Sequence, residues 1–280
     1  MKILAIDIGG TKFTLALFEG GRMTRRESHA SDRAQGREWM LRQIAGILAG
    51  WNNIERCGIG FGGPVDFPRQ RVALSTHAGG WRDFPLSQYV EDLLGVPTVM
   101  DNDANAGALG EARYGVGGPL PLFYVTLSTG IGGGLILGDG SVYRGADSWA
   151  GEIGHLTVQP GGPECLCGAR GCLERMCSGL WLERDHGRPA RELLQDPAFV
   201  ERYVVNLTLG LKAAIMLINP ARVVLGGGVA KAGDALLVPL RAELGRQITA
   251  WSGARVEVVG AGLGDDSVLW GGLALAETIS

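Results

Sequence analysis

The residues best suited to chemistry lie in one short segment, where a histidine and three cysteines fall within 18 positions: His155, Cys165, Cys167 and Cys172. Zn²⁺ takes four ligands in a tetrahedron, and it binds imidazole nitrogen and thiolate sulfur well. Because all four ligands come from the protein, no position remains for a metal-bound water, and the pattern predicts a structural ion. The glycines between the later cysteines allow the tight turns that such a loop needs. Chance clustering of buried cysteines, or a disulfide, is the alternative.

Glycine-rich turns follow several of the expected strands. Glycine accounts for 46 of the 280 residues, and it falls in blocks beside apolar runs, including the pair at 271–272, which we expect to approach a ligand. The blocks Asp7–Lys12 and Ser128–Gly134 follow equivalent strands, and a third block is Gly226–Gly228. Successive backbone N–H groups in such turns form a nest for anions, to which a lysine and threonine hydroxyls add. We therefore expect a nucleotide triphosphate to contact Asp7, Gly9, Gly10, Thr11, Lys12, Thr129, Gly130, Gly227 and Gly228, although a lone glycine-rich turn is usually only a turn.

Two aspartates lie at or just after the ends of expected strands and offer carboxylates there. Asp7 could reach Mg²⁺ through water, because Mg²⁺ keeps several waters and is bound by one or two carboxylates together with phosphates. Asp103 lies where a strand ends and a helix begins, a position that suits a general base and equally a helix N-cap. The residues alone leave both roles of Asp103 open.

Hydrophobic periodicity predicts an α/β protein with an internal repeat, because the second half opens with the same strand, glycine turn and hairpin as the first. The expected strands are Lys2–Ile8, Phe13–Glu19, Met23–Ser28, Cys57–Phe61, Thr98–Met100, Leu122–Leu127, Gly132–Leu137, Val223–Leu225 and Val256–Val259. The expected helices are Gly36–Trp51, Leu86–Leu94, Ala104–Tyr114 with a face of small residues against a close neighbour, Val200–Ile218, Ala235–Ile248 and Val268–Thr278. The charged, proline-containing piece Trp181–Pro197 is expected to contain a loop at Asp185–Pro189.

Composition excludes several classes of function. With 26 basic and 29 acidic residues the net charge is −3, so no nucleic-acid partner is expected. No apolar run approaches the ~20 residues of a membrane span, so no membrane partner is expected either. The chain begins at an apolar strand rather than a signal peptide, and cysteines outside the loop suggest no disulfide framework, so we expect a reducing, cytoplasmic location.

These motifs resemble those of the ROK sugar kinases, members of the actin-like ATPase superfamily, and the resemblance covers nearly the whole chain. Asp7–Lys12 and Ser128–Gly134 resemble the family's two phosphate motifs, and Gly226–Val229 resembles its turn near adenosine. Gly151–His155 with the three cysteines resembles its zinc signature. The resemblance implies a two-lobed α/β fold of the actin-like ATPase (ribonuclease H-like) type with a zinc-binding loop. The expected lobes are residues 1–104 plus 266–280 and residues 105–265, with the zinc loop at 155–172.

The resemblance also implies an ATP-dependent kinase that phosphorylates the 6-hydroxyl of a hexose, with glucose as the expected substrate. It makes Asp103 the catalytic base, and the sugar-binding residues that it implies are Gly63, Asn102, Asp103, Glu152, His155 and Glu174. The two glutamates would otherwise be surface charges. Because the metal fixes His155 and the loop that carries Glu174, metal binding and sugar binding are expected to be coupled. Asp101 is assigned no role.

The implied cofactors are a structural Zn²⁺ and Mg²⁺ with ATP, and the implied assembly is a homodimer. Phe61-Gly62 stands where relatives often have Val-Pro, which leaves the sugar open, and the segment after Glu174 is short for the family, which leaves nucleotide affinity open. N-acetylmannosamine, or another amino sugar or hexose, is the alternative substrate. A non-catalytic sugar sensor is the alternative class. Repressors of the family carry a DNA-binding module before the first strand, which we do not expect here.

Overall fold

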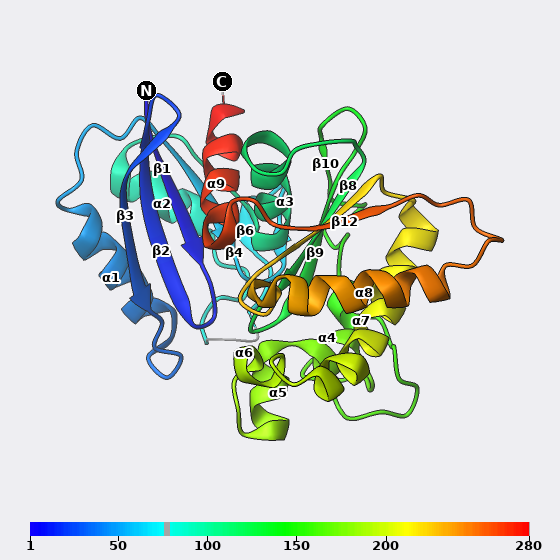
Figure 1. Cartoon of the computed structure of the whole chain (residues 1–280). Helices are drawn as coiled ribbons and strands as arrows, with labels where there is room; N and C mark the ends of the chain where they lie inside the picture. Colours follow the sequence, from blue (N-terminus) through cyan, green and yellow to red (C-terminus); the bar gives the residue numbers. More distant parts are fainter. Residues whose placement is uncertain (76–78, 280) are drawn as a thin grey trace. The chain divides into compact units, whose positions relative to one another are not determined.

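The computed structural model describes residues 1–75 and 79–279, which fold into two compact units (Figure 1). The first unit comprises Met1–Gly115, Arg144–Ala150 and Asp266–Ser280, and the second comprises Val116–Tyr143 and Gly151–Asp265. Among the described residues, no helix combines the length and the apolar character needed to cross a membrane.

The first unit is built on a five-stranded sheet with the strand order β3-β2-β1-β4-β7. Its strands are β1 (Lys2–Ile8), β2 (Lys12–Glu19), β3 (Arg22–Ala30), β4 (Arg56–Phe61) and β7 (Thr98–Asn102), and the short hairpin of β5 (Val65–Asp66) and β6 (Arg71–Val72) follows β4. The strands β1, β4 and β7 are parallel, with Asp7 opposite Gly60 and Gly60 opposite Asp101. The three strands therefore end at one edge of the sheet, where polar residues follow each of them.

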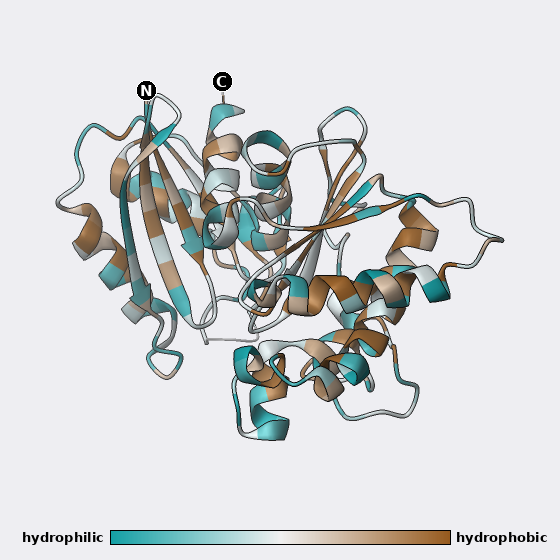
Figure 2. Cartoon of the chain, viewed as in Figure 1, coloured by the Kyte–Doolittle hydropathy of each residue, from teal (hydrophilic) through white to brown (hydrophobic). Residues whose placement is uncertain are grey.

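Helices cover both faces of this sheet, because successive residues of a strand point to opposite sides. Leu4 and Ile6 of β1 lie in a core that includes residues of α1 (Gly36–Leu48) and α2 (Leu86–Leu94). Ile3 and Ala5 lie in a second core with Leu269 and Leu273 of α9 (Ser267–Glu277). Figure 2 shows the apolar residues along these strands and helices.

The helices α3 (Asp103–Tyr114) and α9 approach each other closely, because glycines lie where they meet. A Cβ on Gly271 would lie 1.9 Å from the carbonyl oxygen of Ala106, and a Cβ on Gly110 would lie 2.2 Å from that of Ser267. The expected small-residue face of α3 is confirmed. The expectation that glycines 271–272 approach a ligand is wrong, since both lie within α9 and Gly272 packs against Gly58.

The second unit repeats the sheet of the first, with the strand order β10-β9-β8-β11-β12. Its strands are β8 (Leu122–Leu127), β9 (Ile131–Ile136), β10 (Val142–Tyr143), β11 (Arg222–Gly226) and β12 (Glu257–Gly260). Here too a hairpin precedes parallel pairings, because β9 is antiparallel to β8 while β8, β11 and β12 are parallel. The predicted internal repeat is confirmed. One large core joins this sheet to α7 (Pro197–Ile218) and α8 (Asp234–Gln247).

The segment between the two halves of the second sheet differs most from the sequence-based expectation. It contains η1 (Ile153–His155), α4 (Leu173–Cys177), α5 (Gly179–His186) and α6 (Ala190–Leu193), and η2 (Ala230–Ala232) and η3 (Gly264–Asp266) follow later in the chain. The loop expected at Asp185–Pro189 is shorter, because α5 continues to His186 and Gly187 ends it in the left-handed conformation at φ 65°. The long helix α7 begins at Pro197, three residues earlier than expected, and the Asp196 carboxylate accepts a hydrogen bond from Ala198 N at 3.0 Å.

The two compact units are not identical to the two lobes expected from the sequence. Helix α3 packs against α9 within the first unit, whereas the expected second lobe starts at residue 105. The division at residues 104 and 105, which describes the bodies that would move during catalysis, stays a prediction.

Candidate functional site

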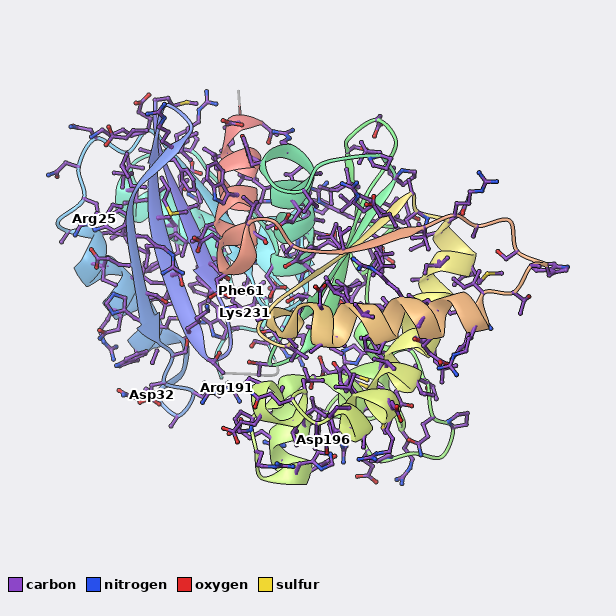
Figure 3. The ribbon with its side chains drawn as sticks, in the orientation of Figure 1. Arg25, Asp32, Phe61, Arg191, Asp196 and Lys231 are labelled. Carbon is purple, nitrogen blue, oxygen red and sulfur yellow. The ribbon has the colours of Figure 1, made fainter. Side chains whose placement is uncertain are left out.

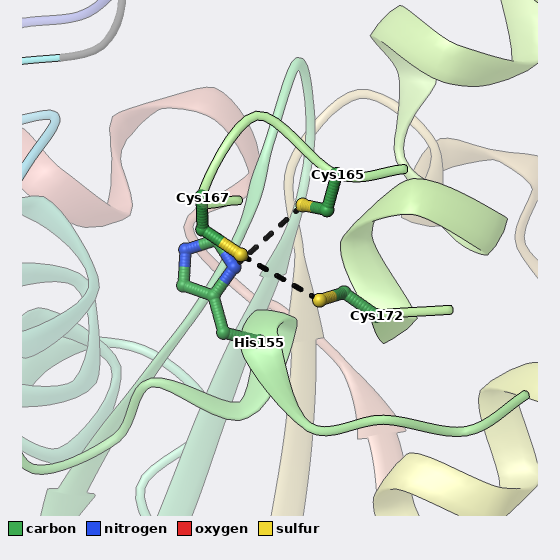
Figure 4. Close-up of side chains that lie close together, drawn as sticks. All are labelled: His155, Cys165, Cys167 and Cys172. Carbon is green, nitrogen blue, oxygen red and sulfur yellow. Dashed lines mark hydrogen bonds between the residues drawn. The ribbon is translucent and has the colours of Figure 1, made fainter. Parts of the chain in front are cut away.

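The histidine and the three cysteines of the predicted zinc loop converge on one point (Figure 4). One ligand atom from each of His155, Cys165, Cys167 and Cys172 lies within 4.8 Å of all the others. The sulfurs of Cys167 and Cys172 are 3.7 Å apart, and the Cys165 sulfur is 3.9 Å from His155 Nδ1. Two sulfurs held by zinc at ~2.3 Å in a tetrahedron lie about 3.8 Å apart, so both donor set and spacing fit zinc. All five cysteines are free, so the disulfide alternative is wrong.

Short backbone contacts close the metal loop. Isolated β-bridges pair Thr157 with Cys172 and Glu164 with Arg170, and Cys165 N donates a hydrogen bond to Ala169 O at 2.8 Å. Gly171 has φ +68°, and a Cβ there would lie 1.8 Å from Gln159 O. The prediction that glycines permit this tight turn is confirmed.

Three of the predicted sugar-binding side chains lie together beside the metal loop. Glu152 Oε2 is 3.8 Å from His155 Nε2. Burial raises the pKa of Glu152, the His155 imidazole acts in the opposite direction, and the charge of Glu174 adds to the rise. His155 Nδ1 thus faces the Cys165 sulfur while its Nε2 faces the Glu152 carboxylate.

Glu174 also holds the second glycine-rich turn, a contact that the sequence analysis missed. Its Oε2 accepts a hydrogen bond from Ile131 N at 2.9 Å, and a Cβ on Gly130 would lie 2.7 Å from the same oxygen. Glu174 lies in α4, two residues after Cys172, so the metal loop and the turn at 128–130 share one side chain. No local sequence signal identifies this pairing, because the two partners are 43 residues apart.

The second and third glycine-rich turns lie side by side. Gly179 N, at the start of α5, donates a hydrogen bond to Ser128 O at 2.7 Å, and Val229 N donates to Leu127 O at 2.9 Å. Gly227 has φ +85°, and a Cβ there would lie 2.5 Å from Leu127 O. Glycine is therefore required at this position both for its conformation and for the close approach.

A cavity of ≈ 570 Å³ opens beside the third turn, at Gly228. Its lining combines apolar side chains, including Leu194 and Val200, with the polar side chains of Arg191, Gln195 and Lys231. Figure 3 labels Arg191 and Lys231, and the Lys231 ammonium pairs with Asp265 at 2.6 Å. This cavity was not predicted from the sequence, because no helix was expected at Ala190–Leu193, where α6 contributes Arg191 to one wall.

In the first unit, hydrogen bonds fix the first glycine-rich turn. Gly9 N donates to Lys12 O at 2.9 Å. From the end of β3, Ser31 Oγ donates to Gly9 O at 3.1 Å and Arg33 Nε donates to Gly10 O at 2.7 Å. Thr11 is exposed, while Asp7 and Lys12 are half-buried. The residues that follow β3 thus fix the turn through its carbonyl oxygens, at Gly9 and Gly10.

Asp103 is the first residue of α3 and not its cap. Asn102 Oδ1 accepts hydrogen bonds from Ala104 N at 2.9 Å and Asn105 N at 3.4 Å, and Asn102 Nδ2 donates to Gly63 O at 3.0 Å. The alternative that Asp103 serves as the N-cap is therefore wrong. The Asp103 carboxylate faces the neighbouring turn, since a Cβ on Gly62 would lie 3.4 Å from its Oδ2.

Asp7 and Asp103 interact electrostatically at this edge of the sheet. Burial raises the pKa of Asp7 from its ordinary 3.8 to about 7, and the negative charge of Asp103 contributes, while Lys12 and Arg26 act in the opposite direction. Two neighbouring carboxylates of like charge suit a divalent cation, which relieves the repulsion between them. The residues present fit Mg²⁺ at this place.

Comparisons with known proteins agree with these features. The glucokinase of Thermotoga maritima is 30% identical, over 98% of this chain and 97% of its own length. The N-acetylmannosamine kinase of Vibrio cholerae is 33% identical, over 82% of this chain and 84% of its own. The crystal structure of a ROK family glucokinase from Streptomyces griseus with glucose and AMPPNP has a TM-score of 0.87 and 29% identity, and the match covers 100% of both chains. Residues 3–279 match the ROK family, and the chain belongs to that family.

Proposed function

We propose that this chain is an ATP-dependent sugar kinase that phosphorylates the 6-hydroxyl of a hexose, with glucose as its substrate. The observation that carries the proposal is the position of Asp103 at the start of α3, where Asn102 and not Asp103 caps the helix. Capping therefore does not account for an aspartate at this site. The name of the Thermotoga maritima relative supports glucose.

In this reaction Asp103 accepts the proton of the sugar hydroxyl. The hydroxyl oxygen attacks the γ-phosphorus of ATP, and ADP leaves. A positioned base of this kind contributes roughly 10²–10⁴-fold to the rate. The phosphoryl group is otherwise transferred by positioning and charge neutralisation, and Mg²⁺ supplies part of that neutralisation when it is bound with ATP. Asp7 would hold the ion through water, and Lys12 would contact the phosphates.

The nucleotide is proposed to bind along the glycine-rich turns. The first turn offers Gly9, Gly10 and Thr11, and the second offers Thr129 and Gly130. In the second unit, the cavity beside Gly227 and Gly228 suits an adenosine group, because its walls combine apolar and polar side chains. The AMPPNP in the Streptomyces griseus neighbour supports a nucleotide as the phosphoryl donor.

The sugar hydroxyls are proposed to bind Gly63, Asn102, Asp103, Glu152, His155 and Glu174. Asn102 uses its oxygen for the helix cap and its Nδ2 for Gly63 O, so it would act partly by fixing the turn that faces the sugar. His155 can serve metal and sugar at once, because Nδ1 faces the Cys165 sulfur and Nε2 faces Glu152. A neutral imidazole bound to metal through Nδ1 carries its proton on Nε2, where it can donate to a hydroxyl.

The ion in the His–Cys₃ loop is proposed to be Zn²⁺ in a structural role. The donor set favours zinc over hard cations, which prefer oxygen ligands. The loop carries His155 and leads directly into α4 with Glu174, so metal binding would order two sugar-binding residues.

The protein is further proposed to be a cytoplasmic homodimer. ATP as substrate and three unoxidised cysteines in one loop suit a reducing compartment. A second copy would cover one exposed face of α7, where Val205, Leu209 and Met216 are spaced by four and seven residues and are 41%, 38% and 41% exposed. Sedimentation equilibrium tests this, since Leu209→Glu should convert a dimer into monomers, and a monomeric parent protein would refute it.

N-acetylmannosamine is the second candidate substrate, because the Vibrio cholerae kinase named for it is 33% identical over most of both chains. A panel of glucose, mannose, N-acetylmannosamine and N-acetylglucosamine with ATP and Mg²⁺, followed by ADP release, ranks the substrates by kcat/KM. Glucose should rank first, and a higher kcat/KM for N-acetylmannosamine would replace it.

The same panel with Asp103→Asn separates a kinase from a sugar sensor. The variant should bind sugar normally and lose at least ~10²-fold in kcat. Asp92→Asn, which changes an exposed carboxylate on α2, is the matched control and should retain its activity. Sugar binding by the parent protein without ADP release from any sugar would favour the sensor.

A further inference from the structure

Asp101, which the sequence analysis left without a role, is the most buried carboxylate at the edge where β1, β4 and β7 end, with 1% of its surface exposed. Its Oδ1 accepts hydrogen bonds from Asn102 N at 2.8 Å and Asn105 Nδ2 at 3.0 Å. Its Oδ2 accepts two more from Arg144, at 2.8 Å from Nε and 2.7 Å from Nη2. A buried charge needs such partners, since an unpaired one is strongly destabilising.

Arg144 reaches Asp101 from a segment that crosses between the two units. Residues Arg144–Ala150 belong to the first compact unit, whereas the residues on both sides of them belong to the second. The Arg144 guanidinium lies 3.5 Å from the centre of the Phe67 ring, and Phe67 N donates a hydrogen bond to Ser148 Oγ at 3.2 Å. Ala150 N closes the segment by donating to Arg144 O at 3.1 Å. The crossing segment is thus anchored at both ends on the first unit.

The chain connects the ion pair to two parts of the proposed sugar site. On one side, Asp101 holds the backbone N–H of Asn102, whose side chain caps α3 and so orients Asp103 at its first position. On the other side, the crossing segment ends at Ala150, two residues before Glu152. Glu152 in turn leads into η1, which ends at His155.

We propose that Arg144, through Asp101, is a positioning residue that fixes the Asp103 base at the start of α3. This inference rests on the proposed kinase function and adds to it two residues that are not among the proposed ligand-binding residues. The planar guanidinium of Arg144 donates from two nitrogens to one oxygen of Asp101, which fixes direction as well as distance in a way that the point charge of a lysine cannot reproduce. Misplacement by a fraction of an ångström costs rate, because phosphoryl transfer depends on alignment of the attacking oxygen.

The competing explanation is that the ion pair only stabilises the fold. The two explanations predict different turnover for a variant that lacks both charges. Replacing a buried ion pair by uncharged side chains is often neutral for stability, so such a variant can stay folded. The double variant Asp101→Asn/Arg144→Met removes both charges and leaves neither unpaired. If the pair positions the base, this variant stays folded and loses turnover.

The experiment measures kcat, the KM for sugar and for ATP, and the thermal midpoint for Arg144→Lys and for the double variant, each with and without Asp103→Asn. We expect kcat to fall about 10-fold with KM for ATP within about twofold of the parent. In the Asp103→Asn background, the same changes should lower the residual kcat by less than about twofold, because the base that they position is already absent.

The matched control is Arg71→Met. Arg71 also makes an ion pair with an aspartate of the first unit, at 2.7 Å from Asp83, and its side chain is 27% exposed compared with 22% for Arg144. This control should retain the kcat of the parent.

Two results would overturn the inference. One is a kcat for the double variant equal to that of the parent. The other is an equal loss of kcat with and without the Asp103 carboxylate, which would show that Arg144 does not act through the base. Failure of the parent protein to turn over any sugar is a separate result that would remove the proposed function together with this inference.

Discussion

Adding one methyl group at Gly130 should weaken the binding of both sugar and nucleotide. The methyl group displaces the Glu174 side chain, which the metal loop and the second glycine-rich turn share. In Gly130→Ala the new Cβ would lie 2.7 Å from Glu174 Oε2, whereas ordinary contacts begin at 3.4 Å. Glu174 must therefore retreat. The same oxygen holds Ile131 N at 2.9 Å, so the retreat lengthens that hydrogen bond.

The size of the effect follows from this geometry. A retreat of about 0.7 Å takes the Ile131 N to Glu174 oxygen distance to about 3.6 Å, beyond hydrogen-bonding range. A hydrogen bond to a charged group contributes roughly 1.5–3 kcal/mol. Glu174 is only half-buried, so its freed carboxylate regains some hydration. The net cost is about 1–2 kcal/mol, which is about 5–30-fold in affinity.

The assay compares equilibrium binding of the sugar and of an ATP analogue, by titration calorimetry, for Gly130→Ala and Gly138→Ala. Gly138 lies in the turn after β9, where a Cβ would meet nothing within 4 Å, and so it controls for replacing a turn glycine. We expect weaker binding of both ligands in Gly130→Ala, normal binding in Gly138→Ala and unchanged zinc content in both. Normal affinity for both ligands in a folded Gly130→Ala protein would refute this account of Glu174.

Three further predictions concern the metal, the core and pH. Cys167→Ser should lose zinc and bind sugar more weakly, as measured by metal analysis and calorimetry, and unchanged sugar affinity in the metal-free variant would show that the two sites are independent. Gly271→Ala should lower the free energy of unfolding in urea by about 3 kcal/mol, because its Cβ meets the Ala106 oxygen at 1.9 Å. Gly46→Ala, in an open position of α1, should instead raise it by up to ~1 kcal/mol, and equal effects would contradict the packing argument. Because the folded state raises the pKa of Asp7 from 3.8 to about 7, it binds this proton more tightly than the unfolded chain, so stability without nucleotide or metal should fall as pH rises through this interval. Asp7→Asn should reduce that slope in urea titrations at several pH values, and an unchanged slope would exclude Asp7 as its source.

Most strands of the two sheets could be predicted from sequence, because they are short, apolar and bounded by turn residues. The strand Lys2–Ile8 was expected and found with the same ends, and Leu122–Leu127 likewise. The spacing of the histidine and the three cysteines also predicted a metal-binding loop, since few other structures need those four side chains within one loop. Local sequence was sufficient wherever the determining contacts are local.

The short helices α5 and α6 could not be predicted, because their stability comes from tertiary contacts. Glycine, proline and charged residues dominate Gly179–Leu193, and the buried residues Leu182, Ala190 and Leu193 attach it to the core. Helices this short gain little from intrinsic propensity and form because a core receives their apolar side chains. Such a requirement cannot be seen in the segment itself.

The side-chain contacts that connect the parts of the candidate site also could not be predicted from the sequence. Glu174 with Ile131 and Asp101 with Arg144 each join residues 43 positions apart. Neither pair is marked by a motif, because any glutamate or arginine of suitable reach would give the same local pattern. The proposed ligand-binding residues lie in recognisable motifs, whereas the residues that hold those motifs in place do not.

The return of α9 to the first unit has a consequence for biosynthesis. Leu269 and Leu273 of α9 complete the core that Ile3 and Ala5 begin, yet the ribosome makes them after the entire second unit. Domains generally fold as units while the chain emerges. Here the earliest strands of the nascent chain lack part of the cover on one face of their sheet until translation has passed residue 277.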